Sequence, residues 1–366
     1  MTRWTTLVPP AALVALAIAW FTHPEGPVGV TLVAVFLIGA VLAAVHHAEV
    51  VAHRVGDPLG SLILAVAVTV IEVALIVTLM VGDPVHGATL ARDTVFAAVM
   101  LSLNGIVGFS LLVAALRHHL AVFNPEGTGS ALATVVTLAG LTLVLPTFTT
   151  SNPGPEFTSE QLAFAAIASL ALYVLFVFTQ TVRHRDFFLP PQEGASYGGD
   201  GAHDDDHDEH PDHPSNRETV VSVVLLLAAL VAVVGLAKVE SKPLEKAVDA
   251  AGLPQEIVGV VIAALVLLPE AISAVRAAAD DRMQVSFNLA YGSAIASIGL
   301  TIPTIALAKV WLDGPLVLGL QTTQIVLLVL SAIVGILTVV PGRSKPLQGG
   351  LHLVLLATFV FVSIAP

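Results

Sequence analysis

The sequence has no cysteine and little charge. The absence of cysteine among its 366 residues excludes a disulfide framework and any metal site built on thiolates. Only 11 % of the residues are charged, whereas 56 % are hydrophobic, and a water-soluble shell cannot be built from this composition. No Gly-rich loop ending in Lys-Ser or Lys-Thr occurs. We therefore expect no nucleotide, no nucleic acid and no cofactor as a partner.

Long apolar runs take the place of the missing charge. A bilayer core is about 30 Å thick, and a helix needs roughly 20 apolar residues to cross it. The runs predict an all-α integral membrane protein of about eleven transmembrane helices, at 7–22, 28–46, 60–82, 94–115, 131–149, 160–182, 219–237, 254–278, 285–310, 316–340 and 346–365. The first run is read as a membrane helix rather than a secretory signal, because its cleavage pattern is poor.

The basic residues are distributed unevenly between the two sides of this arrangement. With the N-terminus in the cytoplasm, ten of the fifteen Lys and Arg residues fall on the cytoplasmic side and five on the other. Positive residues are enriched in cytoplasmic loops, so the pattern predicts a cytoplasmic N-terminus and an external C-terminus. We expect a multi-pass protein of the inner (plasma) membrane, with the lipid bilayer and inorganic cations as its partners.

One polar segment, 183–218, interrupts the apolar pattern. Its part 200–213 contains seven acidic residues and four histidines, which predicts a disordered cytoplasmic linker. The chain then divides into an extra N-terminal helix (1–27), a first five-helix repeat (28–182), this linker, and a second five-helix repeat (219–366). The charged run could sense a regulatory cation, hold divalent metal, or only keep the linker soluble. The candidates for regulatory cation binding are Asp204, Asp205, Asp206, His207, Asp208 and Glu209.

The two halves share a pattern of polar residues. The second helix of each half carries a glutamate deep in an apolar run, Glu72 in one and Glu270 in the other. The next helix of each half carries Asn-x-x-x-Gly, at 104–108 and at 288–292. An odd number of helices per half makes the halves cross the membrane in opposite directions. This is an inverted repeat, in which transporters place the substrate near the midplane.

The paired glutamates are the candidate ion ligands. An ionised carboxylate in lipid costs about 2.5 kcal/mol or more, so Glu72 and Glu270 should face protein, water or a cation. A divalent cation or protons would neutralise both, and competition for the same oxygens couples the two ions. Hard oxygen ligands suit Ca²⁺ or Na⁺, and we expect Asn104, Asn288 and Ser293 to add oxygens. The alternative is a pair of protonated glutamates that only hydrogen-bond between helices.

A second polar cluster ends the second predicted helix. His46, Glu49 and His53 are spaced i, i+3, i+7, which places them on one helical face. The spacing differs from the His-Glu-x-x-His of zinc hydrolases. It favours a cytoplasmic vestibule that attracts cations or relays protons, with a solvated helix end as the alternative.

These residues resemble those of a known family. His47-Ala48-Glu49, followed by 56–61 and the helix with Glu72, resembles the first α-repeat of the calcium/cation antiporter superfamily. The segments 257–270 and 289–294 resemble the second α-repeat. Within the superfamily the chain is most similar to the ChaA-type bacterial calcium/proton antiporters. The resemblance implies a transporter rather than an enzyme. It implies that Ca²⁺ moves outward in exchange for protons and that the two glutamates carry both ions.

The chain departs from that family at the glutamates themselves. The exchanger motif reads Gly-Asn-Ala-x-Glu, whereas residues 68–71 are Val-Thr-Val-Ile and residues 266–269 are Val-Leu-Leu-Pro. Fewer oxygen ligands then precede each glutamate, so exchange of Na⁺ or K⁺ for protons stays open. A passive cation channel is the third alternative, and the built-in pair of repeats argues against it because channels usually gather pore loops from several subunits.

Overall fold

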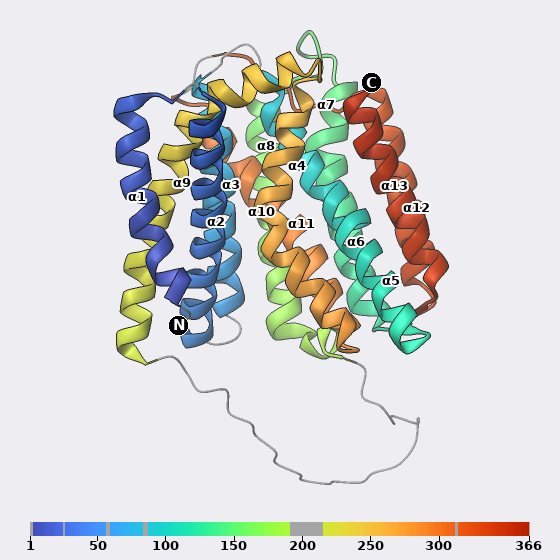
Figure 1. Ribbon diagram of the computed structural model, residues 1–366. Coiled ribbons are helices and arrows are strands. Elements are labelled where there is room, and N and C mark those ends of the chain that lie inside the picture. The colour runs from blue at the N-terminus through green and yellow to red at the C-terminus, as the bar shows by residue number, and fades with distance from the viewer. Residues whose placement is uncertain are drawn as a thin grey trace.

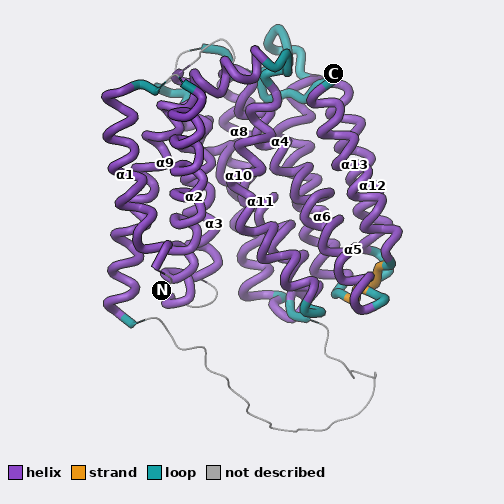
Figure 2. Tube along the Cα trace, in the orientation of Figure 1, coloured by secondary structure: helices purple, strands orange, loops and turns teal. Residues whose placement is uncertain are grey.

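The computed structural model describes residues 3–24, 26–55, 59–82, 87–190, 215–311 and 314–365, and these form a bundle of long helices running between two ends (Figure 1). Helix makes up nearly all of the trace in Figure 2. Among the described residues, 10 helices are long and apolar enough to cross a membrane. The helix α3 (Leu59–Gly82), of 24 residues, adds a further apolar helix. The all-α membrane fold class is therefore confirmed.

The first half of the chain contains two single-helix crossings before α3 and three composite ones after it. In the composite crossings, short π-helical turns join or end the α-helices. The elements are α1 (Arg3–Thr22), α2 (Pro27–Val55), α3, α4 (Gly87–Met100), η1 (Leu101–Ile106), α5 (Val107–His118), α6 (Pro125–Ala139), η2 (Gly140–Val144), α7 (Leu145–Phe148), α8 (Ser159–Phe178), η3 (Thr179–Arg183) and the 3₁₀ turn η4 (Arg185–Phe188).

In its described residues, the second half consists of five α-helices that no π-helical turn interrupts. These are α9 (Asn216–Ala250), α10 (Glu256–Ala279), α11 (Met283–Ala308), α12 (Thr322–Val339) and α13 (Pro346–Ile364). Two short strands, β1 (Ala121–Val122) and β2 (Arg343–Ser344), pair antiparallel and tie the α5–α6 connection to the α12–α13 connection.

Side-chain caps explain where several helices begin. The Asn124 side chain accepts hydrogen bonds from the backbone amides of Glu126 and Gly127 at the start of α6. Thr158 and Ser215 form capping boxes with the third residue of α8 and of α9. Each cap satisfies backbone N–H groups that a helix start otherwise leaves without a partner.

Several predicted helix boundaries differ from the structure, and the difference at 316 has a clear physical reason. The sequence predicts a helix from 316, but 314–321 is not helical and α12 begins at Thr322. Its backbone amides at Val317, Gly319 and Leu320 donate to carbonyls of Ala88, Pro155 and Leu143, at 2.8–3.0 Å. Leu316, Leu318 and Leu320 are buried, so the segment packs into the bundle through its side chains and these backbone hydrogen bonds rather than as a helix.

The extra helix α1 lies at the edge of the bundle, against α2 and α9 (Figure 1). His47 joins the three helices, because one ring nitrogen lies 3.3 Å from the Ser222 hydroxyl of α9 and the other lies 3.0 Å from the Thr5 carbonyl of α1. This histidine is fully buried. It therefore acts as a structural contact of α2 rather than as part of an open vestibule.

The two ends of the bundle can be told apart. The N-terminus and the start of α9 lie at one end, called here the linker end, and the C-terminus lies at the other, called the far end (Figure 1). Arg54 at the end of α2 donates to Asn216 at the start of α9, at 2.6 Å. The equivalent helices α2 and α9 thus cross in opposite directions, as expected for inverted halves. The predicted cation-sensing residues of 204–209 lie outside the described residues, so their role stays a prediction.

The contact between α5 and α13 depends on a glycine. A Cβ at Gly349 would lie 2.7 Å from the backbone nitrogen of Leu112 and 2.9 Å from the carbonyl oxygen of Gly108. At the neighbouring Gly350, an added Cβ would meet nothing within 4 Å.

We therefore expect Gly349→Ala to lower the free energy of unfolding of the purified protein by about 1–3 kcal/mol, the usual cost of overpacking, and to lower its melting temperature. Gly350→Ala, with the same change in helix propensity, should leave the melting temperature close to that of the wild type. Equal melting temperatures for the two variants would contradict the close approach of α5 and α13.

Candidate ion-binding site

A cavity of about 250 Å³ lies inside the bundle, between helices of both halves. Its walls come from α3, α4 and α8 with η3 in the first half, and from α10 and α11 in the second half. Both predicted glutamates, Glu72 and Glu270, line it. Most of the remaining wall is apolar, so the two carboxylates dominate the charge of the space.

The two carboxylates have different surroundings. Glu72 is 4 % exposed, and its Oε1 accepts a hydrogen bond of 2.6 Å from the Ser297 hydroxyl of α11. Glu270 is 9 % exposed, and its buried Oε2 has no hydrogen-bond partner within the described part of the chain. A buried carboxylate oxygen without a partner is costly. The cavity wall at Glu270 is therefore suited to a proton or a cation.

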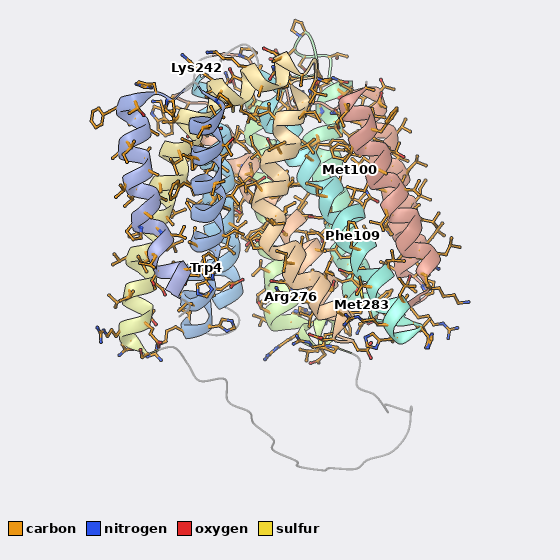
Figure 3. The ribbon with its side chains drawn as sticks, viewed as in Figure 1. Trp4, Met100, Phe109, Lys242, Arg276 and Met283 are labelled. Atoms are coloured by element: carbon orange, nitrogen blue, oxygen red, sulfur yellow. The ribbon has the colours of Figure 1, made fainter. Side chains whose placement is uncertain are left out.

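Helix register brings the glutamates into the same space. Glu72 and Glu270 each lie near the middle of a helix of 24 residues. On α4, Ala98 lines the cavity, and Met100 two residues later lies between the two ends of the bundle (Figure 3). In the same view Arg276 lies at the linker end and Lys242 at the far end. The site therefore lies inside the bundle, away from both ends.

The cavity continues from the glutamates toward the linker end. Gln180, in η3 at the end of its crossing, and Val285, near the start of α11, both line it. Asn288 lines this part as well. Its amide nitrogen donates to the Phe188 carbonyl at 2.7 Å, and its oxygen accepts from Gln284 at 3.0 Å. Asn288 thus lies about 13 Å along α11 from Ser297, nearer the mouth than the glutamates.

Ser293 also lines the cavity, between these two levels of α11. Asn104 does not belong to the cavity lining. It is fully buried, its amide nitrogen donates to Ser331 of α12 at 2.8 Å, and its oxygen lies 3.2 Å from Nδ1 of His352 on α13. The matched rank of the two asparagines in the sequence therefore does not give them matched surroundings.

The predicted vestibule residues lie on α2. Glu49 is half-buried, and its charge and that of Glu72 both act on Glu270. His53 is exposed near the helix end, where its charge acts on Glu49. The Nε2 atom of His46 is buried and lacks a hydrogen-bond partner among the described residues. Of these three residues, Glu49 is thus the one whose charge acts on a glutamate of the cavity.

Sequence reasoning missed three polar residues of the cavity wall: Thr69, Tyr173 and Gln180. Thr69 precedes Glu72 by three residues, which is one helical turn, and this spacing was a usable signal. Gln180 is a polar residue inside the apolar run 160–182, and its polarity there was a usable signal as well. Nothing in the sequence indicates that Tyr173 faces the cavity.

A bundle of membrane-crossing helices in opposed halves, with buried carboxylates around an internal cavity, is the architecture of a secondary transporter. The chain belongs to the Sodium/calcium exchanger protein family, whose profile matches residues 25–182 and 221–365. It is therefore a membrane antiporter of cations and not an enzyme.

Two curated proteins are similar over almost the full chain. One, from Sinorhizobium fredii, is named as a proposed ionic transporter, y4hA; it is 42% identical over 365 residues, which cover 99% of this chain and 96% of that protein. The sodium-potassium/proton antiporter ChaA of Escherichia coli is 32% identical over 365 residues, with the same coverage of both chains.

Two solved structures share the fold. Native YfkE superposes with a TM-score of 0.73 at 16% identity, covering 99% of this chain and 100% of that chain. The H⁺/Ca²⁺ exchanger CAX gives a TM-score of 0.67 at 13% identity, covering 98% of this chain and 88% of that chain.

The hydrogen bond from Ser297 to Glu72 gives a direct test of the site. We expect Ser297→Ala to weaken the apparent cation affinity by about tenfold, because a hydrogen bond to a charged group contributes about 1.5–3 kcal/mol. Ser286→Ala is the matched control, since Ser286 is a buried serine of the same helix that does not line the cavity. Cation-dependent proton flux in vesicles would measure both, and equal affinities would contradict the assignment of Ser297.

Proposed function

We propose that the protein exchanges cytoplasmic Ca²⁺ for external protons at Glu72 and Glu270. The observation that carries the proposal is an internal cavity lined by one glutamate from each half, in which Oε2 of Glu270 has no hydrogen-bond partner among the described residues. Two negative charges in such a space repel each other unless a cation or protons neutralise them. One Ca²⁺ supplies two charges, and its hard oxygen preference matches carboxylate, hydroxyl and amide ligands.

Competition for the same oxygens couples the two ions. When the cation leaves, two unpaired carboxylates in the membrane interior would be costly. They must therefore take up protons before the site can change its access to the other side of the membrane. The protein then returns protonated and releases the protons where a new cation binds. In this scheme Ser293 and Ser297 add hydroxyl oxygens beside the glutamates, and Asn288 acts at the mouth of the cavity. Asn104 is not part of this ligand set, because its side chain is engaged by Ser331 and His352.

The linker end is proposed to face the cytoplasm. The cavity continues toward that end, where Gln180 and Val285 line it. The helix ends there carry most of the basic residues, as in Arg54, Arg117 and Arg276, and cytoplasmic ends of membrane proteins are rich in such residues. We propose that α2–α8 and α9–α13 are inverted repeats in the inner membrane of a cell. In this proposal the cavity in this structure is open inward. Glu49 attracts cations to it, with His46 and His53 nearby.

A second candidate is exchange of Na⁺ or K⁺ for protons. The observation that favours it is the similarity to ChaA, which is named for sodium, potassium and protons. Within the described ranges, no group of three or more His, Cys, Asp or Glu side chains suited to a metal ion occurs, so few charged ligands are available for a cation. A monovalent ion demands fewer ligand charges than Ca²⁺ does.

The test is proton movement in inverted vesicles, with Ca²⁺, Na⁺ and K⁺ added separately. Glu72→Gln and Glu270→Gln should each reduce exchange at least about a hundredfold, because the amide keeps the shape but loses the charge and the exchangeable proton. Both variants should still insert and fold, since a neutral amide is cheaper to bury than a carboxylate. Glu49→Gln should be milder.

Glu126→Gln, at an exposed position of the linker end, is the control and should behave as the wild type. A wild-type response to Ca²⁺ alone supports the first candidate, and a response only to Na⁺ or K⁺ supports the second. Wild-type exchange in both glutamine variants would overturn the role of the glutamates.

A further inference from the structure

A buried ion pair lies outside the cavity, in the second turn of α4. Arg92 and Asp93 are 3 % and 5 % exposed, and an NH2 nitrogen of the guanidinium lies 2.7 Å from Oδ1 of Asp93. Neither residue lines the cavity. A buried ion pair is weak support for stability, because the cost of removing two charges from water offsets most of their attraction. Apolar residues of similar volume often replace a buried ion pair without loss of stability, so stability alone does not explain these charges.

The ion pair packs on the face of α10 that carries Glu270. Gly259, Ala263 and Glu270 share one face of α10, since their spacing of four and then seven residues follows the helical period. A Cβ at Gly259 would lie 2.9 Å from the carbonyl carbon of Asp93 and 2.9 Å from the nitrogen of Thr94. The two backbones therefore touch at Asp93, about 16 Å along α10 from Glu270, on the side away from the linker end.

Polar groups connect the ion pair with the cavity. Thr94 lies one turn before Ala98, which lines the cavity, and its buried hydroxyl has no hydrogen-bond partner in the part of the chain described. Thr301, fully buried, lies one turn beyond Ser297. Glu256, in the first turn of α10, adds a negative charge that acts on Asp93. Polar side chains of α4 and α11 thus lie beyond the glutamates toward the far end, where the backbones of α4 and α10 are in contact at Gly259.

We propose that Asp93 is a further ion-handling carboxylate, which receives the cation or proton between the two glutamates and the far side of the membrane. When no ion is present, Arg92 neutralises Asp93, and the close contact at Gly259 keeps water from the glutamates. When the far side opens, separation of α4 from α10 at Gly259 exposes a carboxylate already directed at the route. The inference rests on the exchange proposed for Glu72 and Glu270.

The test measures affinity from each face separately, in vesicles of both orientations. The double variant Arg92→Gln/Asp93→Asn removes both charges and leaves no uncompensated one, so the protein should fold. We expect the half-saturating Ca²⁺ concentration at the far face to rise about tenfold, and that at the linker end to stay within about twofold, a difference within the usual range of coupling between sites. Glu160→Gln, at an exposed acid at the start of α8, is the control for loss of a carboxylate near the far face.

A structural role alone would give a different result. It would lower the melting temperature and leave both half-saturating concentrations unchanged, or shift both by the same factor, and either outcome overturns the proposal. Failure of the proposed function itself is distinguishable, because Glu72→Gln and Glu270→Gln would then retain exchange in the same vesicles.

A second measurement tests the contact at Gly259. The chain has no cysteine, so Thr94→Cys introduces a single thiol without background. In otherwise wild-type protein this thiol should react slowly with a membrane-impermeant maleimide added at the far face. Adding Gly259→Ala, which forces the backbones apart, should raise that rate at least about fivefold. An unchanged rate, or a rise only from the linker end, would contradict a closure at this position.

Discussion

The fold is organised around the cost of holding two carboxylates in a membrane-embedded cavity. Glu72 has one serine hydroxyl as a partner and Glu270 has an oxygen with none, within the residues that the structure describes. Neither can remain charged there without compensation, and the apolar walls offer little. The cavity is therefore suited to positive charge, and in the exchange proposed here that preference links cation movement to proton movement.

The surrounding helices limit the access of water to the two carboxylates. If water could enter the cavity from both sides of the membrane at once, the carboxylates would be solvated. Ions would then leak through the protein without coupling. The cavity continues toward the linker end, whereas α4 and α10 are in backbone contact toward the far end. The helices α2 and α9 cross in opposite directions, which agrees with the inverted repeats proposed here. In that proposal, access alternates between the two faces by movement of packed helices, and the ligands stay the same.

The features that could be predicted from the sequence depend on the length of the apolar runs and on the free-energy cost of a charge in lipid. Apolar length gave the helices, and the expense of a charge in lipid singled out Glu72 and Glu270, which line one cavity. Asn104 shows the limit, because the same motif as at Asn288 lies in a π-helical turn, where its amide meets Ser331 and His352. The buried pair at Asp93 shows another, since adjacent opposite charges near a helix start look solvated in a sequence. Such placements depend on tertiary packing, which local pattern does not contain.

The central claim is that cation and protons compete for the same two carboxylates. Proton release on Ca²⁺ binding measures this directly, by titration calorimetry of the purified protein in buffers of different ionisation enthalpy. The account predicts that Ca²⁺ displaces between about one and two protons from the wild type, and that the release disappears in the double variant Glu72→Gln/Glu270→Gln. Binding of Ca²⁺ to the wild type without proton release, or unchanged release in the double variant, would contradict it.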